Sequence, residues 1–182
     1  MPNYRRARTA GGTYFFTVVT ERRRKFLTGP EARTTLRSVV QEVRRLHPFT
    51  IDAWVLLPDH IHCLWTLAAA DTDYSKRWGQ IKAGFSRQMK VNLPSRGNLS
   101  RSRERHREAS IWQRRFWEHQ IHDEEDFRHY MDYIHHNPVK HGWAATAGDW
   151  PYSTFHRYVA RGIYPATWGD GDRLTSDGEY GE

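Results

Sequence analysis

The alternation of hydrophobic and polar positions predicts two strand–helix–strand units in residues 11–121. Runs of β-branched and aromatic residues predict strands. Apolar residues three or four positions apart predict amphipathic helices. Strands are expected over residues 11–20, 49–57, 60–67 and 111–121, and helices over residues 30–47 and 71–92. Pro58-Asp59 is typical of a turn, so the second and third strands should form a hairpin.

This βαββαβ order is that of the ferredoxin-like fold, an α+β architecture in which two helices cover one face of an antiparallel sheet. A further helix is expected over residues 123–137, because acidic residues in its first turn suit the helix dipole. Pro138 should end that helix. A single domain is expected over residues 1–165, followed by a fraying Gly- and Asp-rich tail over residues 166–182.

Charge and composition narrow the class of protein. The chain carries 28 Lys and Arg against 21 Asp and Glu, a formal net charge of +7, and 14% of its residues are aromatic. This combination favours a nucleic-acid partner over a merely basic surface. Residues 92–110 contain many arginines and almost no apolar residues, which is typical of a basic loop or a disordered segment.

Cysteine content and apolar runs bear on the compartment. Cys63 is the one cysteine of the sequence, so an internal disulfide is excluded and a reducing compartment is favoured. The N-terminus lacks the apolar core of a signal peptide, and no apolar run approaches the ~20 residues of a membrane helix. We therefore expect a soluble cytoplasmic protein with no membrane partner.

Two histidines interrupt the third predicted strand. Side chains alternate along a strand, so His60, His62 and Leu64 should share one face. Two imidazoles at this spacing on a rigid strand can chelate one divalent ion. The alternative is a pair of structural histidines satisfied by hydrogen bonds.

The helix expected over residues 123–137 carries a polar row beside its apolar stripe. The stripe consists of Phe127, Tyr130, Met131 and Ile134. His129, Tyr133 and Asn137 are four residues apart and lie beside it. If the stripe packs on the sheet, Tyr133 should sit at the edge of the contact, where its hydroxyl could meet whatever the two histidines hold. An ordinary amphipathic tyrosine is the alternative.

Several segments, taken in order, resemble a known family. "PDHIHCLW" (58–65) is similar to the HUH motif, two histidines flanking a hydrophobic residue, and "HYMDYIHHNPVKHGW" (129–143) to the nucleophile helix of single-tyrosine HUH transposases. The match is narrowed by "YRRARTAGGTYFFTVVT" (4–20), "IWQRRFWEHQI" (111–121) and "WPYSTFHRYVARGIYP" (150–165). Together they resemble the REP-associated tyrosine transposases, bacterial relatives of insertion-sequence transposases.

The resemblance implies an enzyme that nicks and rejoins single-stranded or hairpin DNA at repetitive extragenic palindromes through a 5′-phosphotyrosine. It implies His60 and His62 as ligands of one divalent ion, Mg²⁺ or Mn²⁺, and Tyr133 as the nucleophile. Many insertion-sequence relatives carry a third ligand, a glutamine, four residues after the tyrosine. This chain departs from that pattern with Asn137, which can ligate through its carbonyl oxygen or serve as a C-terminal helix cap.

Basic side chains are the candidates for DNA contact, each with a solvated surface charge as its alternative. They are Arg5, Arg6, Arg8, Arg114, Arg115 and Lys140, together with the arginines of residues 96–107. A non-catalytic palindrome-binding protein derived from a transposase is the alternative to the enzyme. A metal-dependent hydrolase of small molecules would need more acidic ligands near the histidine pair. Monomer and homodimer both stay open.

Overall fold

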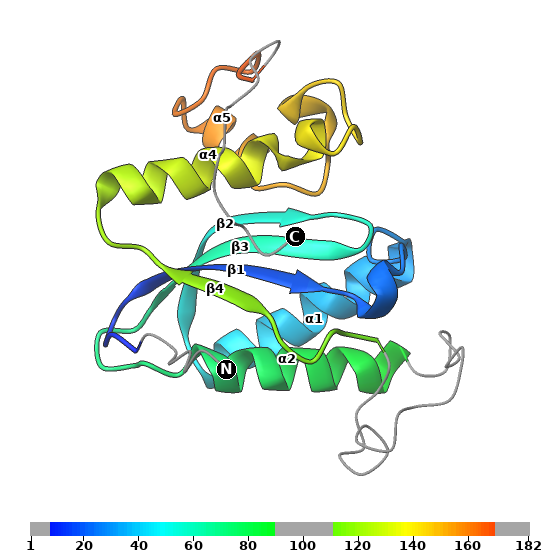
Figure 1. Cartoon of the computed structure of the whole chain (residues 1–182), viewed down its shortest axis with the longest axis vertical. Helices are drawn as coiled ribbons and strands as arrows, with labels where there is room; N and C mark the ends of the chain where they lie inside the picture. Colours follow the sequence, from blue (N-terminus) through cyan, green and yellow to red (C-terminus); the bar gives the residue numbers. More distant parts are fainter. Residues whose placement is uncertain (1–7, 90–110, 170–182) are drawn as a thin grey trace, which may run out of the picture.

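The computed structural model describes residues 8–89 and 111–169 of the chain. They form a sheet that lies between two helical layers, as Figure 1 shows. The strands are β1 (Thr13–Val19), β2 (Phe49–Leu56), β3 (His60–Leu67) and β4 (Trp117–Gln120). The helices are α1 (Pro30–Leu46), α2 (Tyr74–Met89), α4 (Glu124–Lys140) and α5 (Phe155–Ala160), with short 3₁₀ turns at η1 (Glu21–Arg23) and η2 (Ala147–Asp149).

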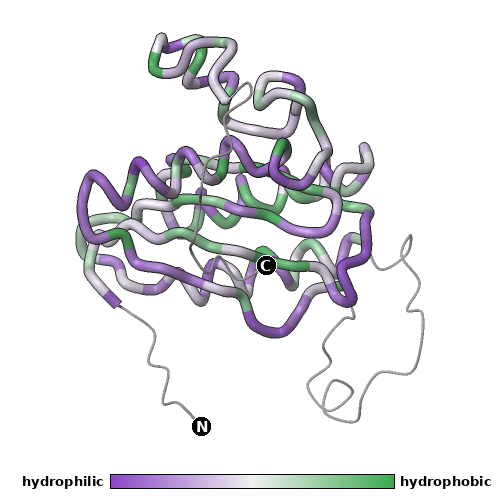
Figure 2. Tube along the Cα trace, turned by 45° about the horizontal axis from the view of Figure 1, so that its top comes forward, coloured by the Kyte–Doolittle hydropathy of each residue, from purple (hydrophilic) through white to green (hydrophobic). Residues whose placement is uncertain are grey.

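The sheet has the strand order β2-β3-β1-β4, and every neighbouring pair is antiparallel. This order, with the βαββαβ succession of elements, is that of the ferredoxin-like fold, and the predicted fold class is confirmed. The central strands β1 and β3 are buried almost throughout, because helices cover both faces of the sheet. Figure 2 shows hydrophobic residues along the central strands and hydrophilic ones along the outer turns.

Helices α1 and α2 cover one face of the sheet. Strand β1 directs Tyr14, Phe16 and Val18 into this layer, as the two-residue period of a strand requires. Aromatic packing is dense there: the rings of Trp65 and Trp78 stack with their centroids 4.4 Å apart. This layer holds the larger of the two hydrophobic clusters and anchors the sheet.

Helix α4 covers the opposite face. Phe15 of β1 and Leu64 of β3 point into this second layer and pack with Tyr130 and Ile134 of the helix. The layer is smaller, and α5 and the residues around it complete it. The face that carries the two histidines of β3 is therefore the face that receives α4.

The boundaries of β4 and α4 differ from the sequence-based expectation. The fourth strand is limited to Trp117–Gln120. Upstream of it, Trp112 forms an isolated bridge with Thr20, and the carbonyls of Gln113 and Arg114 accept hydrogen bonds from Lys82. These carbonyls are bound by a side chain and not by a neighbouring strand. The second difference is in α4, which continues past Pro138 to Lys140.

Some residues that carry sequence-based expectations lie outside the described part of the chain. They include Arg5, Arg6, the basic segment 92–110 and most of the tail over 166–182. At the end of the described chain, the Trp168 ring packs 4.7 Å from the Tyr164 ring. Within residues 8–89 and 111–169, no helix combines the length and apolar character needed to cross a bilayer.

Candidate active site

The histidine pair lies in the interior, on the face of β3 that is covered by α4. His60 and His62 are 1% and 0% exposed, and their ring centroids are 4.7 Å apart. On β1 they are paired with Val19 and Thr17. The structure therefore brings the two side chains together on one face, as strand alternation predicts.

Each ring is held through its Nδ1 atom. His60 Nδ1 lies 2.6 Å from Asp59 Oδ1, and His62 Nδ1 lies 2.8 Å from Thr17 Oγ1. A metal-binding histidine commonly has one ring nitrogen hydrogen-bonded in this way while the other faces the ion. His60 Nε2 is buried and has no hydrogen-bond partner among the residues that the structure describes.

Asp59 is fixed on both its side chain and its backbone. Its Oδ2 forms a 3.3 Å ion pair with Arg23, and its carbonyl accepts hydrogen bonds from the backbone and hydroxyl of Thr20. Burial raises the pKa of the Asp59 carboxyl, but the hydrogen bond and charge of His60 and the ion pair with Arg23 outweigh it, so the pKa lies below its ordinary value. An ionised Asp59 accepts the Nδ1 proton of His60 and directs the opposite nitrogen into the site.

Tyr133 comes to this site from α4. Its ring centroid lies 5.3 Å from that of His62 and 5.9 Å from that of Phe15. The side chain is 4% exposed, so it lies within the contact between helix and sheet and not at the edge, where the helical stripe alone would place it. His129, one turn earlier, is exposed, so the predicted polar row is divided between solvent and core.

Asn137 lies one helical turn beyond Tyr133 and is fully buried. The expectation that it stands at the very end of the helix is wrong. The C-cap is His141, whose backbone N–H donates to the carbonyl of Asn137, so the Asn137 side chain is not a terminal cap. Its i, i+4 spacing from Tyr133 places both side chains on the same side of α4.

The helix passes through Pro138 because the surrounding packing favours it. A proline removes one backbone donor and disfavours the α conformation of the preceding residue. Asn137 and Pro138 are both buried, and the backbone N–H of Trp143 donates to the carbonyl of Pro138 over 2.8 Å. The buried contacts and this closing turn outweigh the local preference.

Lys140 has a contact that the sequence did not indicate. Lys140 is a candidate for DNA contact, and its Nζ also donates a 3.2 Å hydrogen bond to the Tyr133 hydroxyl and lies 4.8 Å from the centroid of that ring. The available signal was spacing, since residues seven apart are two turns apart on one side of a helix. His141 is a second neighbour, with its ring centroid 5.2 Å from that of His60.

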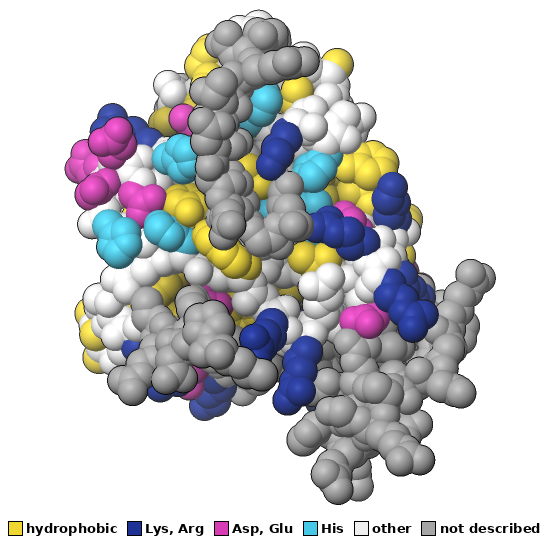
Figure 3. All heavy atoms as spheres, in the orientation of Figure 1, with side chains coloured by type: hydrophobic (Ala, Val, Ile, Leu, Met, Phe, Trp, Pro, Cys, Tyr) yellow, Lys and Arg dark blue, Asp and Glu magenta, His cyan; other side chains and the backbone are white. Residues whose placement is uncertain are grey.

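The other described candidates for DNA contact are on the surface. Arg8, Arg114 and Arg115 are exposed. On the face drawn in Figure 3, histidine side chains form two groups, one beside acidic side chains and one beside lysine and arginine side chains. Basic groups close to a histidine site can neutralise phosphates of a strand that is bound there.

The chain is similar to known proteins over most of its length. The model of a family described as "Transposase IS200 like" matches residues 9–137, a range that holds both histidines, Tyr133 and Asn137. A REP-associated tyrosine transposase of Escherichia coli (strain K12) is 46% identical over 168 residues, 92% of this chain and 91% of that protein. A solved REP-associated tyrosine transposase bound to a REP hairpin is 46% identical, with a TM-score of 0.83, covering 100% of this chain and 98% of that one.

Proposed function

The chain belongs to the family of IS200-like transposases, and on that premise we propose that it nicks and rejoins DNA strands with Tyr133 as the nucleophile. The observation that carries the proposal is the meeting of Tyr133 with the His60–His62 pair. The strand β3 and the helix α4, which are distant in the sequence, contribute to one buried site, with 5.3 Å between the Tyr133 and His62 rings.

The proposed substrate is single-stranded or hairpin DNA of the repetitive extragenic palindrome type. Support comes from the relative of 46% identity that was solved with a REP hairpin and from the net charge of +7. The exposed Arg8, Arg114 and Arg115 are the described side chains that would bind phosphates. Such contacts give affinity and register, and not sequence preference.

The proposed reaction is a transesterification. The Tyr133 hydroxyl loses its proton and its oxygen attacks the phosphorus, forming a new P–O bond while the bond from phosphorus to the 3′ oxygen breaks. The departing 3′ oxygen takes up a proton. The products are a 5′-phosphotyrosine and a strand with a free 3′-hydroxyl, and the reverse attack by that hydroxyl restores the phosphodiester without an external energy source.

The residues present fit a divalent ion. His60 and His62 would hold it through Nε2, since both Nδ1 atoms are already bound and His60 Nε2 is a buried nitrogen with no partner within the described chain. Asn137 is proposed as the third ligand, from the same side of α4 as Tyr133. When bound, Mg²⁺ or Mn²⁺ would neutralise the charge that develops on the non-bridging phosphate oxygens.

Lys140 is proposed to act on the nucleophile. A tyrosine in water has a pKa near 10, so only about 0.1% of it is phenolate at pH 7. An ammonium 3.2 Å from the Tyr133 oxygen stabilises the negative charge that this oxygen gains on losing its proton. In the reverse step the same ammonium would stabilise the phenolate as a leaving group.

The test is formation of a covalent protein–DNA adduct. Wild-type protein, Tyr133→Phe and the matched control Tyr130→Phe are incubated with Mn²⁺ and a labelled hairpin oligonucleotide, and the products are separated on a denaturing gel. We expect an adduct from wild type and from Tyr130→Phe, and none from Tyr133→Phe. Binding, followed by fluorescence anisotropy, should be nearly unchanged because only one hydroxyl is removed.

Two results would overturn the proposal. An adduct formed by Tyr133→Phe but lost in Tyr130→Phe assigns the nucleophile to Tyr130. Tight hairpin binding without any adduct from the wild-type chain, at any Mn²⁺ or Mg²⁺ concentration, supports the alternative of a palindrome-binding protein that has lost catalysis.

A further inference from the structure

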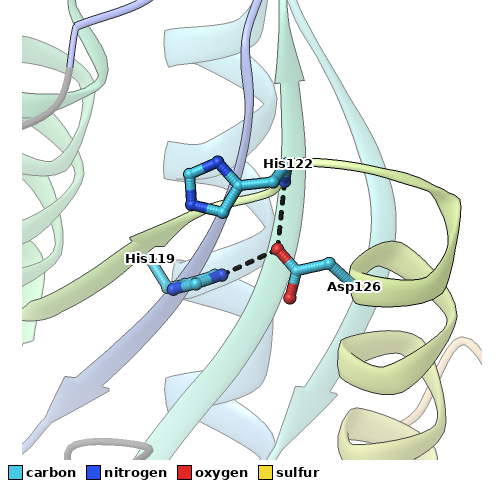
Figure 4. A group of neighbouring side chains, drawn as sticks. All are labelled: His119, His122 and Asp126. Atoms are coloured by element: carbon cyan, nitrogen blue, oxygen red, sulfur yellow. Dashed lines mark hydrogen bonds and ion pairs between the residues drawn. The ribbon is translucent and has the colours of Figure 1, made fainter.

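A second group of metal-ligand side chains lies at the junction of β4 and α4. His119 belongs to β4, His122 to the link between the two elements, and Asp126 to the first turn of α4. Figure 4 shows the His119 ring directed toward the Asp126 carboxylate, with the His122 ring beside them. One ligand atom from each lies within 4.8 Å of the other two. This group shares no residue with the His60–His62 site.

Local backbone structure creates the group. Asp123 caps α4 by accepting a hydrogen bond from the backbone N–H of Asp126 over 2.9 Å, so α4 begins there. Asp126 then points back along the link, where its Oδ2 accepts from the backbone N–H of His122 at 3.0 Å and lies 2.8 Å from His119 Nε2. The carboxylate is therefore fixed between the link and the strand.

The three side chains are partly exposed to solvent, and the protein holds two of them in place. The side chains of His119 and Asp126 are 28% and 20% exposed, and His122 is exposed. Figure 3 shows histidine side chains beside acidic ones at the surface of the molecule. An ion can enter, while two of its three ligands are held by the protein.

We propose that His119, His122 and Asp126 bind a zinc ion that fastens the start of α4 to β4. Two imidazoles and one carboxylate are a ligand set of zinc, with water in the fourth position. Ligand atoms around tetrahedral zinc lie roughly 3.3 Å apart, from bonds of about 2.0–2.1 Å. The His119–Asp126 contact must open from 2.8 Å, with release of the proton it shares. The exposed His122 ring must also move closer, because the ligand atoms lie within 4.8 Å of one another and not within roughly 3.3 Å.

The site is linked to the catalytic residues through packed rings. The Tyr130 ring lies 4.6 Å from that of His119 and 4.5 Å from that of Phe15, and the Phe15 ring lies 5.5 Å from that of His62. Asp126 and Tyr133 are seven residues apart, so they project from the same side of α4. An ion at Asp126 would hold the helix that positions Tyr133, although zinc binding itself does not depend on the proposed nuclease activity.

The test counts zinc ions on the untagged full chain. Chelator-treated wild type, His122→Ala and His129→Ala are compared by equilibrium dialysis with zinc chloride and by calorimetry. His122→Ala is the main variant, because its exposed side chain is outside the core and its backbone hydrogen bond to Asp126 is retained. His129 is a matched control, an exposed histidine of α4 that is outside the group.

We expect His122→Ala to bind one zinc fewer than wild type, or to bind that zinc at least ~10-fold more weakly, and His129→Ala to match wild type. Zinc at about 100 times its dissociation constant should raise the melting temperature of wild type by roughly 5 to 10 °C more than that of His122→Ala. Asp126→Asn should show the same loss as His122→Ala.

Equal stoichiometry and affinity in wild type and His122→Ala would overturn the inference and leave the group as a hydrogen-bonded helix start. An equal loss in His129→Ala would overturn it as well, because the binding would then be a general property of surface histidines. Neither result bears on adduct formation by Tyr133, so the two proposals fail separately.

Discussion

The ammonium of Lys140 donates a 3.2 Å hydrogen bond to the hydroxyl of Tyr133, two helical turns before it on α4. The same ammonium lies over the Tyr133 ring. A basic residue on a DNA-processing protein is ordinarily assigned to a phosphate. Here the residue contacts the proposed nucleophile, and the two roles predict different kinetics.

Lys140→Met should lower the single-turnover nicking rate by ~10- to 100-fold and leave hairpin affinity almost unchanged. The substitution removes a positive charge beside the phenolate oxygen, which slows the reaction, but it removes few contacts with phosphates, so binding is kept. Lys140→Arg, which keeps the charge, should recover part of the rate. If Lys140→Met instead binds the hairpin much more weakly while the bound complex nicks at the wild-type rate, Lys140 acts as a phosphate contact and not on the nucleophile.

Asn137→Ala should raise the Mn²⁺ concentration needed for half-maximal nicking by at least ~10-fold if the amide is a ligand. The structure has excluded the competing cap, so an effect on the helix end is not the expected result. The measurement is a metal titration of the nicking rate, accompanied by thermal unfolding without metal. If the metal requirement of Asn137→Ala is unchanged and its thermal stability is reduced, Asn137 contributes to the packing of the core and is not a metal ligand.

Thr17→Val should raise the Mn²⁺ concentration needed for half-maximal nicking, because the Thr17 hydroxyl holds the His62 ring. The substitution keeps the shape of the side chain and removes the hydroxyl that lies 2.8 Å from His62 Nδ1. Loss of such a supporting hydrogen bond typically costs 10–100-fold in metal affinity.

Thr13→Val is the matched control for that titration. Thr13 lies on the same strand, and its hydroxyl bonds that of Thr66 at the far end of β1. The control should keep the wild-type metal curve. If the two variants shift the curve equally, the role assigned to Thr17 is wrong.

Acid stability should depend on His135. This residue of α4 is fully buried, with its Nε2 3.0 Å from the Thr154 hydroxyl. Burial lowers the pKa of His135 to about 3, and the charges of Arg157 and His156 add to the effect. The unfolded chain, with an ordinary pKa near 6.5, binds the proton first, so stability is complete above pH 6.5 and falls as the pH drops toward 3.

At pH 4.5 this residue should account for about 2 to 3 kcal/mol of lost unfolding free energy. His135→Gln can keep a hydrogen bond to Thr154 and does not titrate, so its urea-unfolding free energy should change less between pH 7 and pH 4.5. His129→Gln, at an exposed position of the same helix, is the control and should follow wild type. Identical pH dependence in wild type and His135→Gln would show that His135 is not the titrating group.

The sequence predicted the part of the site that follows from local periodicity. A strand places His60 and His62 on one face whatever the fold, and a helix keeps Tyr133 near its apolar stripe. The depth of Tyr133 was not predicted, because it depends on how closely α4 approaches the sheet. That distance is decided by Phe15 and Leu64, which belong to other elements.

The expectations that were wrong or incomplete also failed because they depend on contacts between elements. Pro138 was expected to end α4 on local preference, but tertiary burial of Asn137 and Pro138 prevails. The pairing of Lys140 with Tyr133 depends on the helix continuing through that proline. The group of His119, His122 and Asp126 was missed because it needs the angle between β4 and α4, which sequence spacing does not give.

One chain supplies both the histidine pair and Tyr133 to the same site, and this limits how many DNA ends it can handle. On the proposed chemistry, a chain whose Tyr133 already carries a 5′ end cannot capture a second end. Acting alone, it is suited to reseal the break that it made. Joining ends from two different molecules requires the released 3′ strand to leave and another to take its place, or a second chain to arrive with its own captured end.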